Sequence, residues 1–202
     1  MTLPLILWDV DDVLNDLTRV CVEKVLPAHF PGIGYEMLKH NPPLPELECD
    51  REKYTAILDE CREQYLCRLT PQKEVVDFFR KYGKLFHSLA LSAAPMRYAP
   101  VSAEWVLRHF GAWIQGTLYV PSFRKDFTVE SVMFKDKGEA VELLNGILVD
   151  DSPENVARAR KKGGKALLFP APWNENCNMS KQEFFTLLLK EIGVKNESDQ
   201  SF

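Results

Sequence analysis

The sequence predicts an α/β protein, a Rossmann-like parallel β-sheet with helices on both faces. Apolar runs of strand length alternate with helical patterns along most of the chain, as in folds built from repeated strand–helix–strand units. These runs are continuously apolar, which is typical of strands covered on both sides. Polar residues directly follow several of the runs, and open sheets of this kind bind ligands at the carboxyl ends of their strands. The length of 202 residues fits one domain with a small insertion.

The composition is that of a soluble globular protein, with 46% hydrophobic and 27% charged residues. A net charge of −4 gives no indication of a nucleic-acid polymer or an anionic membrane as partner. No apolar run is long enough for a transmembrane helix, and the N-terminal segment lacks the basic region of a secretory signal. The five cysteines form no C-x-x-C pair, which favours reduced thiols in a cytoplasmic setting.

The first expected strand, residues 3–8, runs directly into three acids, Asp9, Asp11 and Asp12. Burying unpaired carboxylates is very costly, so these acids should emerge at the tip of the strand. Asp9 and Asp11 would share one side of the chain if the extended geometry persists. Carboxylates this close together suit a divalent cation such as Mg²⁺, although an acidic turn after an ordinary strand would explain the stretch equally well.

Residues 16–70 are predicted to be a mostly helical insertion. A helix over 14–26 is closed by Pro27, and the proline- and glycine-rich stretch 27–50 is irregular, with a short helix around 35–40. Asp50 is a suitable cap for a helix over 51–66.

Regular alternation resumes after this insertion. Thr70 as cap with Pro71 as first residue predicts a helix over 71–82, and Ser180 with Glu183 forms a capping-box pattern for a last helix over 181–192. Further strands are expected over 85–91, 117–120, 147–149 and 165–169, and further helices over 101–110, 137–144 and 153–162. The loop 121–135 carries Arg124 and Lys125, which are expected to be solvated. We predict the strand order 3-2-1-4-5, because it places strands one and four side by side and brings their acids together.

Four other residues stand at the ends of predicted strands or at the start of a predicted helix. Ser92 ends the second expected strand, Asp150 and Asp151 end the fourth, and Lys137 begins a helix although a cation there opposes the helix dipole. Each alone has an ordinary explanation, as a turn residue, a helix-entry acid pair and a solvated lysine. Their coincidence at one edge of the predicted sheet, next to Asp9 and Asp11, indicates a site.

This ordered set resembles the four motifs of the haloacid dehalogenase superfamily of phosphohydrolases. The motif residues are Asp9-Val10-Asp11-Asp12-Val13, Leu91-Ser92, Lys137 and Val149-Asp150-Asp151. The stretches 92–105 and 136–137 are also similar to the 5′(3′)-deoxyribonucleotidases of that superfamily. The resemblance implies a hydrolase core formed by residues 1–15 and 71–192, a helical cap over 16–70 and a flexible tail over 193–202.

The resemblance also implies roles at the reacting phosphorus. Asp9 would be the nucleophile that forms an aspartyl-phosphate, and Asp11 would protonate the leaving oxygen and then take a proton from water. Ser92, with the Ala93 N–H, would hold phosphoryl oxygens, and Lys137 would supply a fixed positive charge. Lys135 and Lys125 remain alternatives for that lysine.

Mg²⁺ is the implied cofactor, held by the Asp9 carboxylate, the Asp11 backbone carbonyl and a carboxylate of the pair Asp150-Asp151. Asp151 is the favoured ligand and Asp150 the favoured partner of the lysine. The implied substrate is a small phosphorylated metabolite, with a nucleoside monophosphate preferred. In the cap, Tyr35, Tyr54, Tyr65 and His40 are equally suited to contact substrate or to pack. The alternative function is an inactive scaffold that serves as a phosphate- or protein-binding module.

Overall fold

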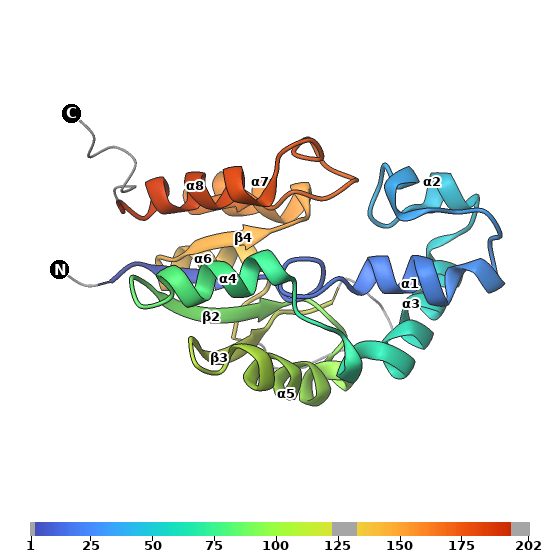
Figure 1. Ribbon diagram of the computed structural model, residues 1–202, viewed down its shortest axis with the longest axis horizontal. Helices are drawn as coiled ribbons and strands as arrows, with labels where there is room; N and C mark the ends of the chain where they lie inside the picture. The colour runs from blue at the N-terminus through green and yellow to red at the C-terminus, as the bar shows by residue number, and fades with distance from the viewer. Residues whose placement is uncertain (1–2, 123–132, 195–202) are drawn as a thin grey trace.

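The computed structural model describes residues 3–122 and 133–194. Its centre is a five-stranded parallel sheet in the order β3-β2-β1-β4-β5, which confirms the predicted order (Figure 1). The strands are β1 (Leu5–Trp8), β2 (His87–Ser92), β3 (Ile114–Tyr119), β4 (Ile147–Asp150) and β5 (Lys165–Leu168).

Helices cover both faces of the sheet, as predicted. One face packs against α4 (Lys73–Tyr82), α5 (Ala99–Phe110) and α8 (Lys181–Glu191), and the other against α6 (Lys137–Leu144) and α7 (Pro153–Lys161). Alternate residues of β1 serve the two faces, since Trp8 belongs to the first cluster and Leu7 to the second. Burial on both sides explains why these strands read as continuous apolar runs.

The segment between β1 and α4 is mostly helical, as expected. It contains α1 (Leu17–Lys24), α2 (Leu44–Leu47), α3 (Arg51–Tyr65) and short 3₁₀ turns over Leu26–Ala28, Tyr35–Met37 and Leu66–Arg68. Figure 1 shows α1, α2 and α3 together at one end of the molecule, opposite the end where the described chain begins before β1 and where α8 ends. This is the end at which the strands present their carboxyl termini.

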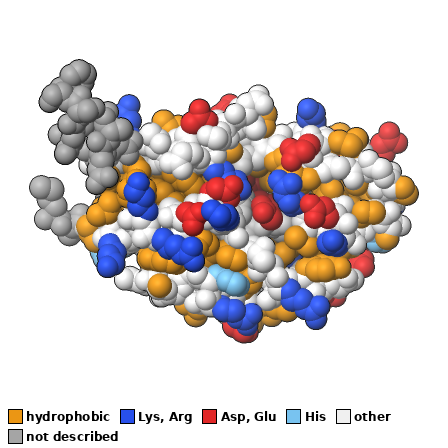
Figure 2. Space-filling model, in the orientation of Figure 1, with side chains coloured by type: hydrophobic (Ala, Val, Ile, Leu, Met, Phe, Trp, Pro, Cys, Tyr) orange, Lys and Arg blue, Asp and Glu red, His pale blue; other side chains and the backbone are white. Residues whose placement is uncertain are grey.

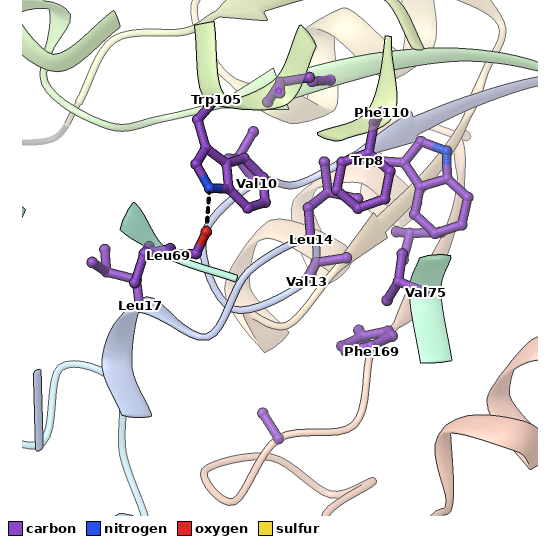
Figure 3. Packing of buried hydrophobic residues seen from close by; sticks show 14 of the residues in the cluster. Trp8, Val10, Val13, Leu14, Leu17, Leu69, Val75, Trp105, Phe110 and Phe169 are labelled. Carbon is purple, nitrogen blue, oxygen red and sulfur yellow. Dashed lines mark hydrogen bonds between the residues drawn. The ribbon is translucent and has the colours of Figure 1, made fainter. Parts of the chain in front are cut away.

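The apolar core continues from the sheet into this helical segment. Val10 and Leu14 follow β1 and are fully buried in the same cluster as Leu17 of α1. In the same cluster the Trp105 indole donates a 2.7 Å hydrogen bond to the Leu69 carbonyl, seen as the dashed line in Figure 3. The helices of this segment therefore share one apolar core with the sheet.

Two predicted helix starts are wrong for one shared reason. The helix expected from Leu14 begins at Leu17, and the helix expected from Pro71 begins at Lys73, without a side-chain cap from Thr70. Asn15 and Pro71 instead form an antiparallel bridge, and the Gln72 N–H donates to the Leu14 carbonyl at 2.9 Å. Pairing between the two ends of the segment thus overrides the local start signals.

The remaining boundaries agree with the predictions to within a few residues. Asp50, Asp136, Ser152 and Ser180 each cap the helix that follows, and Ser180 with Glu183 completes the predicted capping box. The expected flexible tail lies largely outside the described residues, as do Arg124 and Lys125. Within the described residues no helix has the length and apolarity needed to cross a membrane.

Candidate active site

Asp9 stands at the carboxyl end of the central strand. Its backbone N–H continues the ladder to the Val149 carbonyl at 2.9 Å, which brings the ends of β1 and β4 together. Its carboxylate accepts a 2.7 Å hydrogen bond from the Val10 N–H and lies 2.7 Å from the Lys137 ammonium. Burial, together with nearby Asp150 and Asp151, raises the pKa of Asp9 well above its ordinary value, against the opposing effect of Lys137.

Lys137 is the cation at the centre of the acids. It is the first residue of α6, and its side chain is only 3% exposed. Its ammonium lies 2.7 Å from an oxygen of Asp9 and 2.7 Å from an oxygen of Asp150. Burial disfavours its charged form, but the two carboxylates outweigh burial and raise the pKa of Lys137, so it is cationic at neutral pH.

Asp150 has all of its carboxylate engaged. Besides Lys137, it accepts hydrogen bonds from the Ser152 N–H at 2.9 Å and from the Asn155 side-chain amide at 3.1 Å. The pairing of Asp150 with Lys137 is the one that we favoured. A fully buried carboxylate with this many donors is a fixed part of the framework.

Asp151 is less fully engaged. One of its oxygens accepts a 2.9 Å hydrogen bond from the Trp173 indole, and its backbone carbonyl accepts from the Asn174 amide at 2.9 Å. Burial, then the nearby Asp12 and Asp150, raises the pKa of Asp151 well above its ordinary value. A carboxylate that is costly to keep charged in this position is stabilised by any cation placed beside it.

Asp9, Asp150 and Asp151 form a cluster with the chemistry of a hard-cation site. One oxygen from each of the three lies within 4.8 Å of the others. All three are buried, and carboxylate oxygens are the ligands that Mg²⁺ prefers. The donor set therefore fits a Mg²⁺ ion, with Asp9 and Asp151 better placed to bind it than Asp150, whose oxygens already have partners.

Ser92 ends β2, beside β1, and is 3% exposed. Its hydroxyl oxygen accepts a 3.1 Å hydrogen bond from the Ala94 N–H, which holds the turn that follows the strand. Ala93 and Ala94 line one cavity together with Ser92 and Asp9, and they bring no polar side chain to it. The polar groups at this position are therefore the Ser92 hydroxyl and the backbone.

Asp11 and Asp12 point to different partners. The Asp11 carboxylate accepts from the Arg62 guanidinium at 3.1 Å and from the Asn15 amide at 3.3 Å. Asp12 has a left-handed backbone (φ 65°) and accepts from both the backbone and the hydroxyl of Thr18. Burial raises the pKa of Asp12 to about 8, against the two Thr18 hydrogen bonds. Asp12 thus holds the turn into α1.

A cavity of about 930 Å³ connects these groups. Its floor includes Asp9, Ser92, Lys137 and Asp151, and its opposite wall includes Tyr54 and other residues of α3. Figure 2 shows acidic and basic side chains side by side across the middle of one face of the molecule. The volume is that of a small-molecule site.

Comparison with solved structures identifies the architecture. A haloacid dehalogenase-like hydrolase from Streptococcus pneumoniae superposes with a TM-score of 0.59 at 9% identity, over 94% of this chain and 98% of that one. The chain has the haloacid dehalogenase-like fold. A candidate phosphoglycolate phosphatase from Lactobacillus plantarum (TM-score 0.56, 14% identity, 95% and 100% covered) and a haloacid dehalogenase superfamily hydrolase from Geobacter sulfurreducens (0.51, 11%, 92% and 96%) also match. No family model and no curated protein matches the sequence.

On this haloacid dehalogenase-like fold, most of the predicted site residues come together. Asp9, Asp11, Ser92, Lys137 and Asp151 line the cavity, and Asp150 supports Lys137 from beneath. Among the described alternatives, Lys135 lies at the surface and its backbone N–H donates a hydrogen bond to the Glu139 carboxylate.

Of the candidate substrate contacts in the helical segment, Tyr54 lines the cavity. Tyr35 packs edge-on against Trp173 with ring centroids 5.8 Å apart, and His40 lies 3.0 Å from Glu46. Neither they nor Tyr65 is among the residues that line the cavity.

Sequence reasoning missed Arg62, Asn155 and Trp173. Asn155 and Trp173 follow the acids at distances that carry no recognised pattern. Arg62 had a signal, because it follows Tyr54 and Leu58 at intervals of four along the apolar side of α3. A charged side chain on the apolar side of a helix is unfavourable for packing, and such departures from the apolar pattern are concentrated at functional sites.

Proposed function

We propose that this protein is a Mg²⁺-dependent phosphomonoester hydrolase that works through an aspartyl-phosphate. The observation that carries the proposal is the constellation of Asp9, Lys137 and Asp151 on the floor of one cavity, with Ser92 at its side. A nucleophile, a fixed cation and a buried acid cluster are the parts that phosphoryl transfer requires. The phosphatases and hydrolases among the structural neighbours support the same proposal.

In the first step an Asp9 oxygen attacks phosphorus while the bond from phosphorus to the ester oxygen breaks. Asp11 gives its proton to the departing alcohol. Lys137 holds positive charge beside Asp9, and the Ser92 hydroxyl with the neighbouring backbone N–H groups binds phosphoryl oxygens. A bound Mg²⁺, held by Asp9, Asp151 and the Asp11 carbonyl, would neutralise charge on the phosphoryl group.

In the second step water attacks the phosphorus of the aspartyl-phosphate. Asp11 takes the proton from this water, the bond between Asp9 and phosphorus breaks, and inorganic phosphate leaves. Asp9 is thereby restored as a carboxylate and Asp11 as an acid, so the cycle closes without any external reagent.

Residues 16–70 act as a cap in this proposal, and residues 1–15 with 71–192 form the core. The bridge between Asn15 and Pro71 holds together the two chain segments that join the cap to the core. Helix α3 forms the cavity wall opposite Asp9. A cap in this position excludes water and selects the substrate. A cavity of about 930 Å³ admits small esters up to the size of a nucleoside monophosphate.

The test is phosphate release from a panel of phosphomonoesters with Mg²⁺, comparing the wild type with Asp9→Asn and the control Asp77→Asn. Asp77 is an exposed carboxylate on α4, paired with Lys73 and Arg80. We expect turnover of at least one ester by wild type and control, and nearly none by Asp9→Asn. Equal rates for wild type and Asp9→Asn would overturn the nucleophile. A folded wild type that hydrolyses no ester would favour the alternative of a binding module.

A further inference from the structure

Arg62 is a buried cation that reaches from the cap helix to the proposed acid of the core. Its side chain is 8% exposed, and its Nη2 donates to Asp11 Oδ2 at 3.1 Å. Its Nη1 lies 3.5 Å from Asp59 Oδ1, and Asp59 also pairs with Arg97. Burial opposes its charge, but Asp11 and Asp59 outweigh burial and raise the pKa of Arg62, so it remains a cation.

Two of the three guanidinium nitrogens of Arg62 find no hydrogen-bond acceptor among residues 3–122 and 133–194. These are Nε and Nη1, which are both buried, and the ion pair with Asp59 does not have hydrogen-bond geometry. A buried donor without an acceptor loses its hydrogen bonds to water and gains nothing in return, so it destabilises the structure. Nearly all buried polar atoms in native proteins have a hydrogen-bond partner. Because Arg62 lines the cavity, a bound ligand is a suitable acceptor for these two nitrogens.

The present partner of Arg62 is needed elsewhere. Both oxygens of Asp11 are engaged, one by Arg62 and one by Asn15, so the carboxylate faces the cap helix. To act on a leaving oxygen, Asp11 has to release Arg62. Among the described residues, Arg62 would then keep the Tyr98 ring, 5.8 Å from its guanidinium carbon, and Asp59, which it shares with Arg97.

We propose that Arg62 is a specificity-determining residue that binds a second oxyanion, a carboxylate or a second phosphate, on the substrate. This inference rests on the proposed function and narrows its substrate class to acidic phosphomonoesters. A guanidinium makes two parallel hydrogen bonds to a planar or tetrahedral oxyanion, where Asp11 makes one. The incoming anion takes the place of Asp11 on Arg62, and Asp11 is thereby freed for proton transfer. A substrate without that anion leaves the pair closed.

The test uses a pair of esters of nearly equal size. 3-Phosphoglycerate and glycerol 3-phosphate differ by a carboxylate in place of a hydroxymethyl group, and propane-1,3-diol bisphosphate supplies a second phosphate instead. We expect the wild type to favour one or both acidic esters by about 100-fold in kcat/KM, the scale of a buried charge-assisted contact. The better of the two identifies the anion as carboxylate or phosphate.

Two variants and a control locate this preference. Arg62→Gln should lower kcat/KM about 100-fold on the favoured acidic ester and much less on glycerol 3-phosphate, so that the preference collapses. Arg62→Lys keeps the charge without the planar fork and should retain an intermediate preference, and it serves if the glutamine variant does not fold. Lys53→Gln removes a cation from the same helix, one that lies over the Phe30 ring outside the cavity, and should keep the wild-type ratio.

Three results would overturn the inference while leaving the proposed function intact. The first is a wild type that hydrolyses phosphomonoesters but shows no preference for acidic ones, or prefers nucleoside monophosphates to them. The second is an equal loss on all esters in both Arg62 variants, which would make Arg62 only a positioning residue for Asp11. The third is an unchanged ratio in Arg62→Gln. A wild type without any phosphatase activity would instead contradict the proposed function itself.

Discussion

Removing the charge of Lys137 should be among the most damaging single changes to the stability of this protein. The ammonium lies 2.7 Å from both Asp9 and Asp150 and is 3% exposed, so Lys137→Met leaves two buried carboxylates without their cation. Breaking a buried pair in this way costs about 3–5 kcal/mol. For a chain of this length each kcal/mol lowers Tm by about 2–4 °C, so we expect a loss of about 6–20 °C at neutral pH.

The assay is thermal unfolding by circular dichroism in EDTA, which prevents a cation from replacing the lysine. Lys162→Met is the matched control, because Lys162 makes a partly exposed pair with Asp136 at 3.2 Å and should cost under about 1 kcal/mol. Adding Asp150→Asn to Lys137→Met should recover part of the loss, since it removes one of the two uncompensated charges. Equal Tm losses for Lys137→Met and Lys162→Met would refute the electrostatic account of the site.

Three further predictions follow from the acids and their supports. Millimolar Mg²⁺ should raise the Tm of the wild type by about 5–10 °C once it exceeds its Kd by about 100-fold, and Asp151→Asn should lose most of this gain; an unchanged gain would remove Asp151 from the ligand set. Trp173→Phe deletes the 2.9 Å indole hydrogen bond to Asp151 and should weaken Mg²⁺ binding by about 10–100-fold in the same titration, whereas a wild-type Kd would make that bond irrelevant to the metal. Asp136→Ala should cost about 1 kcal/mol at pH 7 by removing the cap of α6, measured by urea unfolding. Burial opposes ionisation of Asp136, but the Glu139 N–H and the Lys162 ammonium outweigh burial and hold the pKa of Asp136 below its ordinary value. The difference in free energy of unfolding between wild type and Asp136→Ala should therefore persist down to about pH 4 and vanish as pH falls through the folded-state pKa. A constant difference at all pH values would contradict this account.

The sheet could be predicted from the sequence because its signals are local and repeated. Continuous apolar strands separated by capped helices admit few topologies, and placing Asp9 beside Asp150 selects one order among them. Ser92 and Lys137 then fall near Asp9 without any further assumption. The helix starts at Leu14 and Pro71 failed because their backbone groups pair across more than fifty residues of intervening chain, which no local pattern records.

The contact between Arg62 and Asp11 lay beyond prediction for a similar reason. It joins two segments that are 51 residues apart, one in a helix of the insertion and one in the loop after β1. The apolar spacing indicates that the side of α3 that carries Arg62 is buried, but it does not say which part of the core that side faces. Packing of Tyr54 and Ile57 into the core fixes the position of α3 and brings Arg62 to Asp11.

The charges of the site explain why a divalent cation and an anionic substrate belong together in it. Among the described residues of the cluster, Asp9, Asp150 and Asp151 bring three carboxylates and Lys137 one ammonium. Two negative charges are left over, and one Mg²⁺ would balance them. Burial raises the pKa values of Asp9 and Asp151, and a cation beside them opposes this effect. A bound metal therefore favours the ionised Asp9 that a nucleophile must be. Once the cluster is balanced, the phosphate of the substrate brings the only new negative charge to the floor of the cavity. A second anion cannot be held there. Of the two arginines of α3 that line the cavity, Arg51 is exposed and Arg62 is buried, so Arg62 is the cation placed to bind it.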